Sequence, residues 1–166
     1  MGMSMMIRRI LFTAVPLALL ACEPPPEEAP PPPPPISEAG TAAMRDAYID
    51  AYMRKNAPGA VAFYSDDAVM YGADGEVYSG KAEIEAAFTA MMEAGMDSLG
   101  LVSQSYEASG DMATDQGTFI RRTLDPRTKE ATRVSGNYKI VVSRDADGNI
   151  FFVQDSIWDT VTLDPQ

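Results

Sequence analysis

The chain has 166 residues, with 24 acidic and 13 basic side chains, and therefore a formal net charge of −11 at pH 7. This charge opposes binding to nucleic acid, which is itself negatively charged. The sequence contains no histidine and a single cysteine, which excludes Ser-His-Asp and Cys-His nucleophiles and zinc sites built on these residues. An acid or base in this chain has to be Asp, Glu, Tyr or Lys.

The first 21 residues have the pattern of a bacterial export signal. Two arginines precede an apolar run from residue 10 to residue 20, which is shorter than a membrane-spanning helix of about 20 residues. The sequence Leu-Leu-Ala-Cys that follows resembles a lipobox and ends at the single cysteine. We predict that residues 1–21 are a lipoprotein signal peptide and that Cys22 is lipidated. A plain secretory signal is the alternative.

Lipidation of Cys22 would supply enough acyl chains for stable membrane anchoring. Glu23 follows it, whereas an aspartate there favours retention at the inner membrane. The lipoprotein resemblance therefore implies a cell-envelope location at the periplasmic face of the outer membrane. Removal of residues 1–21 takes away two arginines and leaves 11 basic against 24 acidic residues, a net charge of −13. No second cysteine is available for an intramolecular disulfide.

Residues 22–36 are predicted to be a lipidated tether. After Cys22 the sequence reads EPPPEEAPPPPPPI, with nine prolines. Such a run forms no helix, and in polyproline II geometry it would reach about 40 Å at roughly 3.1 Å per residue. A ligand for an SH3-like domain is the alternative interpretation. We expect the folded domain to occupy residues 37–166.

The first predicted helix begins at Ser37 and Glu38 and buries one face. The stripe on that face consists of Met44, Ala47, Tyr48, Ala51 and Tyr52. Charged residues, Arg45 among them, lie mostly on other faces. A break at residues 56–59 ends the helix.

The stretch from residue 57 to residue 92 predicts a short helix, a hairpin and a longer helix. The short helical face consists of Ala60, Val61, Phe63 and Tyr64. An extended run at residues 68–71 leads to an Asp-Gly pair within residues 73–76, which predicts a hairpin turn. The third helix begins after Ser79 and ends at Gly95, and its apolar residues recur with helical spacing.

From Met96 onward the pattern predicts four strands joined by turns at residues 109–111, 125–129 and 145–149. In the last strand, strict alternation separates two faces. One face would carry Phe151, Val153, Asp155 and Ile157, and the other Ile150, Phe152, Gln154, Ser156 and Trp158.

The sequences FYSDDAVMY and YSGKAEIEAAF, with the acidic turn at Gly75 between them, resemble the SnoaL-like branch of the nuclear-transport-factor-2-like superfamily. This branch is related to the ketosteroid isomerases. The resemblance covers about residues 39–161 and implies a cone-shaped α+β fold, with three N-terminal helices packed on a curved, mainly antiparallel sheet. It implies no substrate, because this scaffold hosts isomerases, cyclases, dehydratases and proteins that only bind.

Ketosteroid isomerases use a helix tyrosine, an aspartate base and a protonated aspartate on a late strand. The corresponding positions, counted without gaps, are Tyr48, Gly72 and Gly136 or Asn137. Because the last two positions carry no carboxylate, the resemblance does not extend to steroid isomerase activity. Tyr48 matches, and an ordinary core tyrosine is its alternative interpretation.

Asp155 is the main candidate for an acid, a base or a ligand-orienting group, since many SnoaL-like sequences carry an aspartate at this place. A carboxylate among apolar neighbours needs a partner. We expect this partner to be Arg121 or a backbone donor, and a purely structural ion pair is the alternative. The further candidates for binding a ligand are Tyr71, Arg121, Tyr138 and Trp158.

Three functions remain open. The first is a lipid-anchored periplasmic domain that binds a small, largely apolar molecule in the cone without catalysis. The second is a lyase, cyclase or isomerase that uses Asp155 and Tyr48. The third is a homodimeric envelope module that pairs through its open sheet face, as family members often do. We expect no metal or other cofactor. The segment that begins at Asp145 is similar to the start of a calcium-binding loop, but it has Ile150 in place of the required glycine.

Overall fold

The computed structural model describes residues 31–163. Residues Pro32–Gln166 form a compact unit, and this unit contains the whole described hydrophobic core. The predicted signal peptide and Cys22 lie outside the described residues. Within the described part of the tether, residues 31–35 are exposed, but Ile36 is only 3% exposed and joins the core. Among residues 31–163 no helix is long and apolar enough to cross a membrane.

Two of the three helices in the described residues begin at a residue whose side chain caps them. Helix α1 is Glu38–Met53, and the side chain of Ser37 accepts a hydrogen bond from the Gly40 N–H. Helix α2 is Ala57–Val61, and Asn56 caps it through the Gly59 N–H. Helix α3 is Gly80–Glu93. Capping of this kind satisfies backbone donors that have no partner within the helix.

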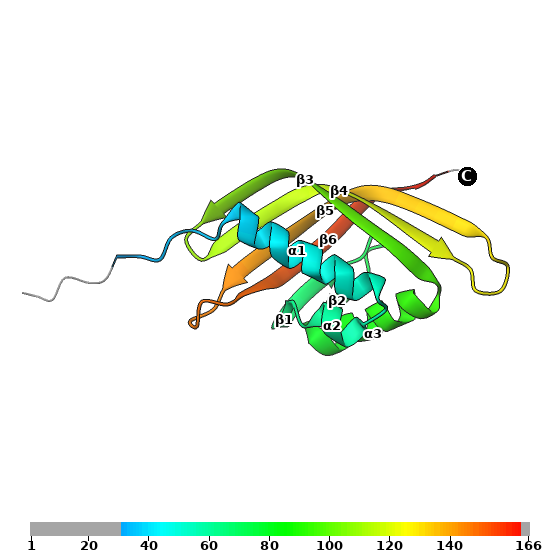
Figure 1. The fold of residues 1–166 in the computed structure, drawn as a ribbon, viewed down its shortest axis with the longest axis horizontal. Helices are drawn as coiled ribbons and strands as arrows, with labels where there is room; N and C mark the ends of the chain where they lie inside the picture. The colour runs from blue at the N-terminus through cyan, green and yellow to red at the C-terminus, as the bar shows by residue number, and fades with distance from the viewer. Residues whose placement is uncertain (1–30, 164–166) are drawn as a thin grey trace, which may run out of the picture. The chain divides into compact units, whose positions relative to one another are not determined.

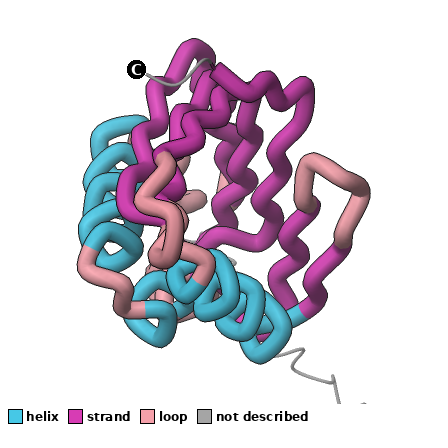
Figure 2. The backbone as a smooth tube through the Cα atoms, turned by 90° about the vertical axis from the view of Figure 1, so that its right-hand side faces the viewer, coloured by secondary structure: helices cyan, strands magenta, loops and turns pink. Residues whose placement is uncertain are grey.

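Six strands form one curved sheet in the order β2-β1-β6-β5-β4-β3. Their bounds are β1 Tyr64–Tyr71, β2 Val77–Ser79, β3 Met96–Ser109, β4 Met112–Leu124, β5 Ala131–Arg144 and β6 Ile150–Leu163. The β1–β6 pair is parallel and the other pairs are antiparallel. The sheet does not close, and the helices lie on one side of it (Figures 1 and 2). The predicted α+β fold, with three N-terminal helices on a mainly antiparallel sheet, is confirmed.

Tyr64 lies in a strand, and its assignment to the short helix was wrong. Helix α2 ends at Val61, and Tyr64 pairs with Phe152 in the parallel register of β1 and β6. The carbonyl of Phe63 accepts a 2.8 Å hydrogen bond from the Phe152 N–H. The helical spacing of this short apolar run was a coincidence, because short runs fit either period.

The buried face of α1 also differs from the predicted stripe. Ala47 is exposed, whereas Thr41 is buried and Arg45 is half-buried on the side that faces the sheet. The prediction assigned Arg45 elsewhere because charged side chains are seldom buried without a partner. A buried partner on β4, described below, explains its position.

A β-bulge in β6 breaks the alternation that the sequence predicted. Val142 pairs with Phe152 and Val141 pairs with Gln154, so Val153 is an extra residue. Because a bulge shifts the alternation by one residue, Phe152 and Asp155 both face the helices. The prediction that they lie on opposite faces was therefore wrong.

Tyr48 lies at the centre of an aromatic cluster between the helices and the sheet. Its ring centroid is 5.6–6.4 Å from those of five neighbours, which are Tyr52, Phe63, Tyr64, Phe88 and Phe152. All five pairs are edge-on or tilted, the arrangement that aromatic quadrupoles favour. This cluster is a main part of the core and supports one end of the site.

Candidate binding cavity

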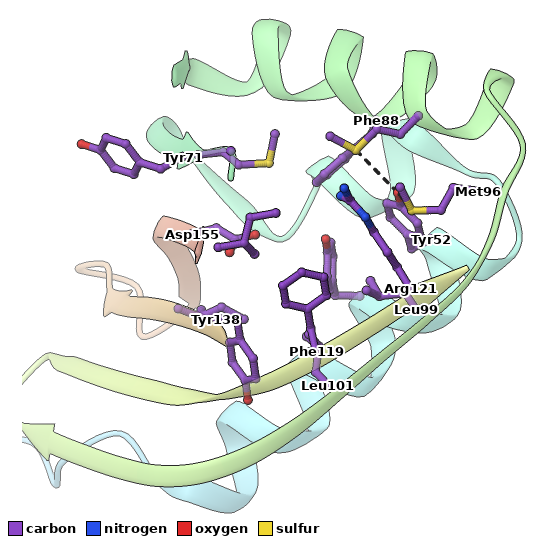
Figure 3. A pocket seen from close by; sticks show the side chains of 16 residues that line it. Tyr52, Tyr71, Phe88, Met96, Leu99, Leu101, Phe119, Arg121, Tyr138 and Asp155 are labelled. Atoms are coloured by element: carbon purple, nitrogen blue, oxygen red, sulfur yellow. Dashed lines mark hydrogen bonds between the residues drawn. The ribbon is translucent and has the colours of Figure 1, made fainter. Parts of the chain in front are cut away.

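A cavity lies between the inner face of the sheet and helices α1 and α3 (Figure 3). It encloses about 620 Å³ of space between atoms, part of which is open to solvent. Its lining is mainly aromatic and aliphatic. The lining residues are Tyr48, Tyr52, Met70, Tyr71, Gly72, Phe88, Met91, Met96, Leu99, Leu101, Phe119, Arg121, Tyr138, Ile140, Asp155 and Ile157. A lining of apolar and aromatic side chains with a few polar groups is typical of a small-molecule site.

Asp155 projects from β6 into this cavity. The hydroxyl of Tyr64 donates a 2.7 Å hydrogen bond to its Oδ2 atom. Burial raises the pKa of Asp155 to about 6, while this hydrogen bond and the Ser156 N–H act in the opposite direction. The partner of Asp155 is thus the Tyr64 side chain, which was not predicted from the sequence, and no ion pair with Arg121 exists among the described residues. Asp155 can therefore change its protonation state near neutral pH.

The hydroxyl groups of Tyr48 and Tyr64 stay protonated near neutral pH. Burial and the neighbouring Asp155 carboxylate raise the pKa of both hydroxyls well above 10. They can donate hydrogen bonds to a carboxylate or a ligand, but they cannot act as bases. The structure thus brings both sequence-predicted catalytic candidates to one cavity, with Tyr64 as the direct partner of Asp155.

Arg121 is a cation in this largely apolar lining. Its side chain extends from β4, and its guanidinium points into the cavity (Figure 3). The guanidinium carbon lies 5.9 Å from the Phe119 ring centroid. Its charge favours ionisation of the nearby Tyr52 hydroxyl, although burial dominates and raises the pKa of that hydroxyl to about 12.

The other three ligand-binding candidates occupy different places. Tyr71 is 40% exposed and lines the cavity, with its hydroxyl pointing away from it (Figure 3). Tyr138 also lines the cavity, but its hydroxyl is used elsewhere, in a hydrogen bond to Asp115. Trp158 is not part of the lining. It lies opposite Asn137 in the β5–β6 ladder and is 38% exposed on the face away from the helices.

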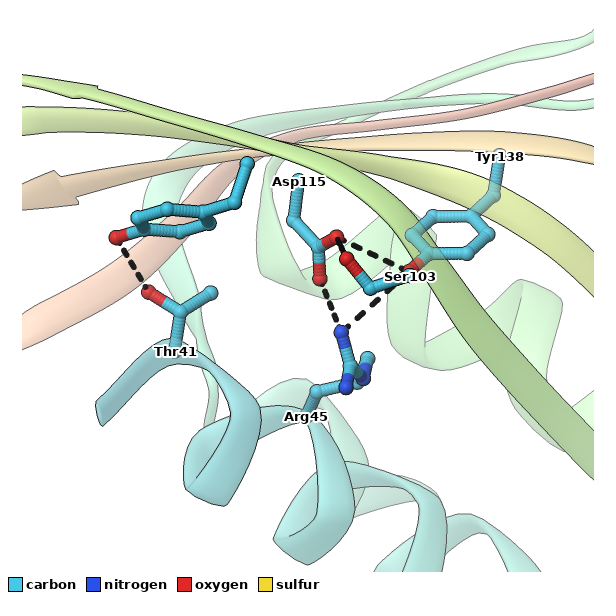
Figure 4. Close-up of polar contacts among 6 residues, drawn as sticks. Thr41, Arg45, Ser103, Asp115 and Tyr138 are labelled. Atoms are coloured by element: carbon cyan, nitrogen blue, oxygen red, sulfur yellow. Dashed lines mark hydrogen bonds and ion pairs between the residues drawn. The ribbon is translucent and has the colours of Figure 1, made fainter. Parts of the chain in front are cut away.

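A second polar cluster, not predicted from the sequence, lies behind the Tyr138 ring (Figure 4). Asp115 is 1% exposed and forms an ion pair with Arg45. It also accepts hydrogen bonds from Ser103, at 2.5 Å, and Tyr138, at 3.2 Å. The sequence does contain a signal for the burial of Asp115. Asp115 is separated from Ala113 and Phe119 by even numbers of residues on β4, so all three side chains lie on the same face, which is the core face.

The described residues contain no group of three or more His, Cys, Asp or Glu side chains that could hold a metal ion. The calcium-like segment at Asp145 forms a turn, in which its carboxylate accepts hydrogen bonds from the N–H groups of Asp147 and Asn149. The observed geometry is that of an Asx turn.

Comparison with a family model places the chain among known domains. A model described as a SnoaL-like domain matches residues 46–152. This range runs from the middle of α1 into the start of β6, and so includes most of the elements that enclose the cavity. A search of curated proteins found no match.

Solved structures share the fold at low sequence identity. A ketosteroid isomerase-like protein from Erwinia carotovora atroseptica is 19% identical, with a TM-score of 0.64 over 75% of this chain and 94% of that chain. A conserved protein from Planctomyces limnophilus is 13% identical, with a TM-score of 0.69 over 76% and 97% of the two chains. An NTF-2-like protein of unknown function from Shewanella oneidensis is 15% identical, with a TM-score of 0.56 over 72% and 96%. Similarity at this level establishes a common fold, and function depends on the site.

Proposed function

This chain belongs to the SnoaL-like domain family, and we propose that it binds a small, largely apolar molecule in the cavity, without catalysis. The observation that carries the proposal is the lining itself, in which apolar and aromatic side chains surround a few polar groups at fixed places. Binding would remove apolar surface from water on both partners, which is favourable by about 25 cal/mol per Å². The narrow interior favours flat or flexible ligands over bulky ones.

Native mass spectrometry of Pro32–Gln166, purified from a bacterial periplasm without detergent, tests this proposal. We expect a bound small molecule that denaturing extraction releases and identifies. Met91→Trp would fill the cavity from α3 and abolish binding. Met112→Trp is the matched control, because Met112 is 51% exposed and lies outside the cavity. Equal ligand occupancy in both variants would show that the molecule binds elsewhere and would refute the proposal.

Acid–base chemistry is the second candidate function. It is supported by a carboxyl group with a pKa of about 6 that faces an apolar cavity beside two protonated tyrosines. Gly72 lines the cavity at the place where ketosteroid isomerases carry their base, so steroid isomerisation is not proposed. Once a ligand is identified, Asp155→Asn should abolish its conversion and leave binding within about threefold. Unchanged turnover in this variant would exclude Asp155 as the catalytic group.

We also propose that Cys22 is lipidated and holds the domain at the periplasmic face of the outer membrane. The sequence pattern of residues 1–36 supports this. Labelling cells with an alkynyl fatty acid should mark the wild-type chain and leave Cys22→Ala unlabelled. Density fractionation should place the wild type in the outer membrane, and Glu23→Asp should move it to the inner membrane. Equal labelling of both chains would refute lipidation at Cys22.

The outer face of the sheet supports a homodimer. Val102, Thr118, Asn137 and Trp158 form one cross-strand row in the ladders of β3 to β6. Their neighbours Leu101 and Phe119 line the cavity, so this row faces away from the helices. Val102 and Val161 on this side are 62% and 59% exposed. Sedimentation of Pro32–Gln166 at micromolar concentration should give a dimer that Val102→Lys disrupts, and a wild-type monomer would refute the proposal.

A further inference from the structure

The guanidinium of Arg121 lacks a carboxylate partner among the described residues. No ion pair or side-chain hydrogen bond of Arg121 is found there, and its contact is with the Phe119 ring at 5.9 Å. Arg121 is half-buried, and its charge points into a lining that is mainly aromatic and aliphatic. A partly desolvated charge of this kind is unfavourable unless a counter-charge binds it.

The two carboxylates that line this cavity or the adjoining groove are held by other residues. Asp97 lines the groove on the outer side of Arg121, and Arg122 binds it through two hydrogen bonds of 2.9 and 2.7 Å. Asp155 lines the cavity and accepts from Tyr64. Both carboxylates therefore have partners that would have to be given up before either could neutralise Arg121.

The strand register separates Arg121 from Asp155. Arg121 lies opposite Val134 on β5, whereas Asp155 lies opposite Ile140 on the same strand. These two β5 residues are six positions apart, which corresponds to about 20 Å along a strand. The cavity thus has a cationic end at Arg121 and a carboxyl end at Asp155. A bound molecule that carries a negative charge would be oriented with this charge toward Arg121.

We propose that the ligand of this cavity is a small, apolar monocarboxylic acid, whose carboxylate binds the Arg121 guanidinium while its apolar body occupies the interior. This inference rests on the proposed binding function and narrows its ligand class. A guanidinium matches a carboxylate through two parallel hydrogen bonds. Arg121 is the one cation in the described lining, so it neutralises one negative charge, and a doubly charged phosphate would keep one charge uncompensated.

The groove next to Arg121 places further positive charge near the cationic end of the cavity. Arg121, Arg122 and Arg133 line it together with a single acidic residue, Asp97. The whole chain, in contrast, has a net charge of −11. A local cationic groove on an acidic protein concentrates small anions at that place. Arg122 and Arg133 lie opposite each other and face the other side of the sheet from Arg121, so their charges add to the positive potential around the cationic end of the cavity.

Isothermal titration calorimetry on Pro32–Gln166 at pH 7.5 tests the ligand class. The probes are benzoate, trans-cinnamate, hexanoate and octanoate, each compared with its neutral primary amide, and hexylphosphonate as a comparison with a higher negative charge. We expect at least one acid to bind about tenfold or more tightly than its amide, since hydrogen bonds to a charged partner are the strong ones. Arg121→Gln should reduce this ratio to below about twofold. Arg127→Gln, an exposed arginine in the β4–β5 turn, is the matched control and should leave the ratio unchanged.

The Nε–H resonance of Arg121 in the wild-type protein gives a second readout that needs no variant. It should shift when the acid is added and stay in place when the amide is added. Amides that bind as tightly as the acids would overturn the inference and leave apolar binding in the cavity intact. Tighter binding of hexylphosphonate than of hexanoate would also overturn it. Failure of every acid and amide to bind would overturn both this inference and the proposed function.

Discussion

The Tyr64 hydroxyl donates a 2.7 Å hydrogen bond to Asp155 and so connects β1 to β6 at the wall of the cavity. Burial favours the protonated form of this carboxyl group, and the hydrogen bond favours the ionised form. Burial is the larger effect, and the pKa of Asp155 is about 6. Asp155 is therefore poised to titrate within the physiological range.

Tyr64→Phe should raise the pKa of Asp155 further. The variant removes a donor that stabilises the carboxylate and leaves the burial almost unchanged. Titration of the Asp155 side-chain carbon by ¹³C NMR would measure the change. Tyr71→Phe is the matched control, because the Tyr71 hydroxyl points away from the cavity. An unchanged midpoint in Tyr64→Phe would mean that the hydrogen bond has no influence on the ionised form.

Asp155→Asn should alter the dependence of stability on pH. In the unfolded chain Asp155 ionises near pH 3.8, whereas in the folded protein it keeps its proton up to about pH 6. The folded state thus binds more protons between these values, and the free energy of unfolding of the wild type falls as the pH rises through this window. The contribution lost by pH 7 is up to about 3 kcal/mol.

Asparagine still accepts the Tyr64 hydrogen bond but does not ionise. Asp155→Asn should therefore be more stable than the wild type at pH 7, and the difference should shrink toward pH 4. Urea unfolding at several pH values between 4 and 7.5 measures both proteins, and comparing them removes the contribution of the other carboxylates. Parallel stability profiles would contradict a raised pKa for Asp155.

Breaking the buried Arg45–Asp115 pair should be strongly destabilising. The two side chains are 13% and 2% exposed, so Arg45→Met leaves a buried carboxylate with hydrogen bonds only from Ser103 and Tyr138. Loss of one partner of a buried pair costs about 3–5 kcal/mol. The double variant Arg45→Met/Asp115→Asn should recover part of this loss, because it removes the unpaired charge.

Arg54→Met provides the matched control for this pair. Arg54 pairs with Asp50 on the same helix, but these side chains are 74% and 59% exposed, and exposed pairs contribute about 0–1 kcal/mol. Urea unfolding would rank the variants. A loss for Arg45→Met as small as that for Arg54→Met would contradict a structural role of the buried pair.

The elements of this fold could be predicted because their signals are local. Ser37 and Gly95 mark the start of α1 and the end of α3, and the turns between the strands carry Gly, Asp and Pro. The pairing of β1 with β6 could not be predicted in this way, because it joins residues about 90 positions apart. It also explains why Tyr64, with its helical spacing, became part of a strand.

The site was predictable in its residue types and less so in its geometry. Asp155, Tyr48, Arg121 and Tyr138 all line the cavity. The three strand residues could be identified because polar groups on otherwise apolar strands are unusual. The extra residue at Val153 decides which side of the sheet the next β6 residues face, and a second shift between Trp158 and Val161 changes the alternation again. No residue type gives a signal for the bulge at Val153, so Phe152 was assigned to the face opposite Asp155. Trp158 was named as a ligand contact, but it lies on the outer face of the sheet.

Gly95→Ala should be far more destabilising than Gly75→Ala. Both glycines have positive φ angles, +98° and +84°, and a left-handed conformation costs an alanine about 1–2 kcal/mol at either position. At Gly95 a Cβ atom would also lie 2.0 Å from the Leu124 carbonyl oxygen, whereas at Gly75 it would meet no atom within 4 Å. The Leu124 N–H donates a 2.9 Å hydrogen bond to the Gly95 carbonyl. Relief of the clash would therefore disturb the contact between the α3–β3 turn and the end of β4. In urea unfolding, we expect the free energy of unfolding to fall by about 1–2 kcal/mol for Gly75→Ala and by at least about 3 kcal/mol for Gly95→Ala. Equal losses would mean that the backbone at Gly95 and Leu124 can move apart without cost.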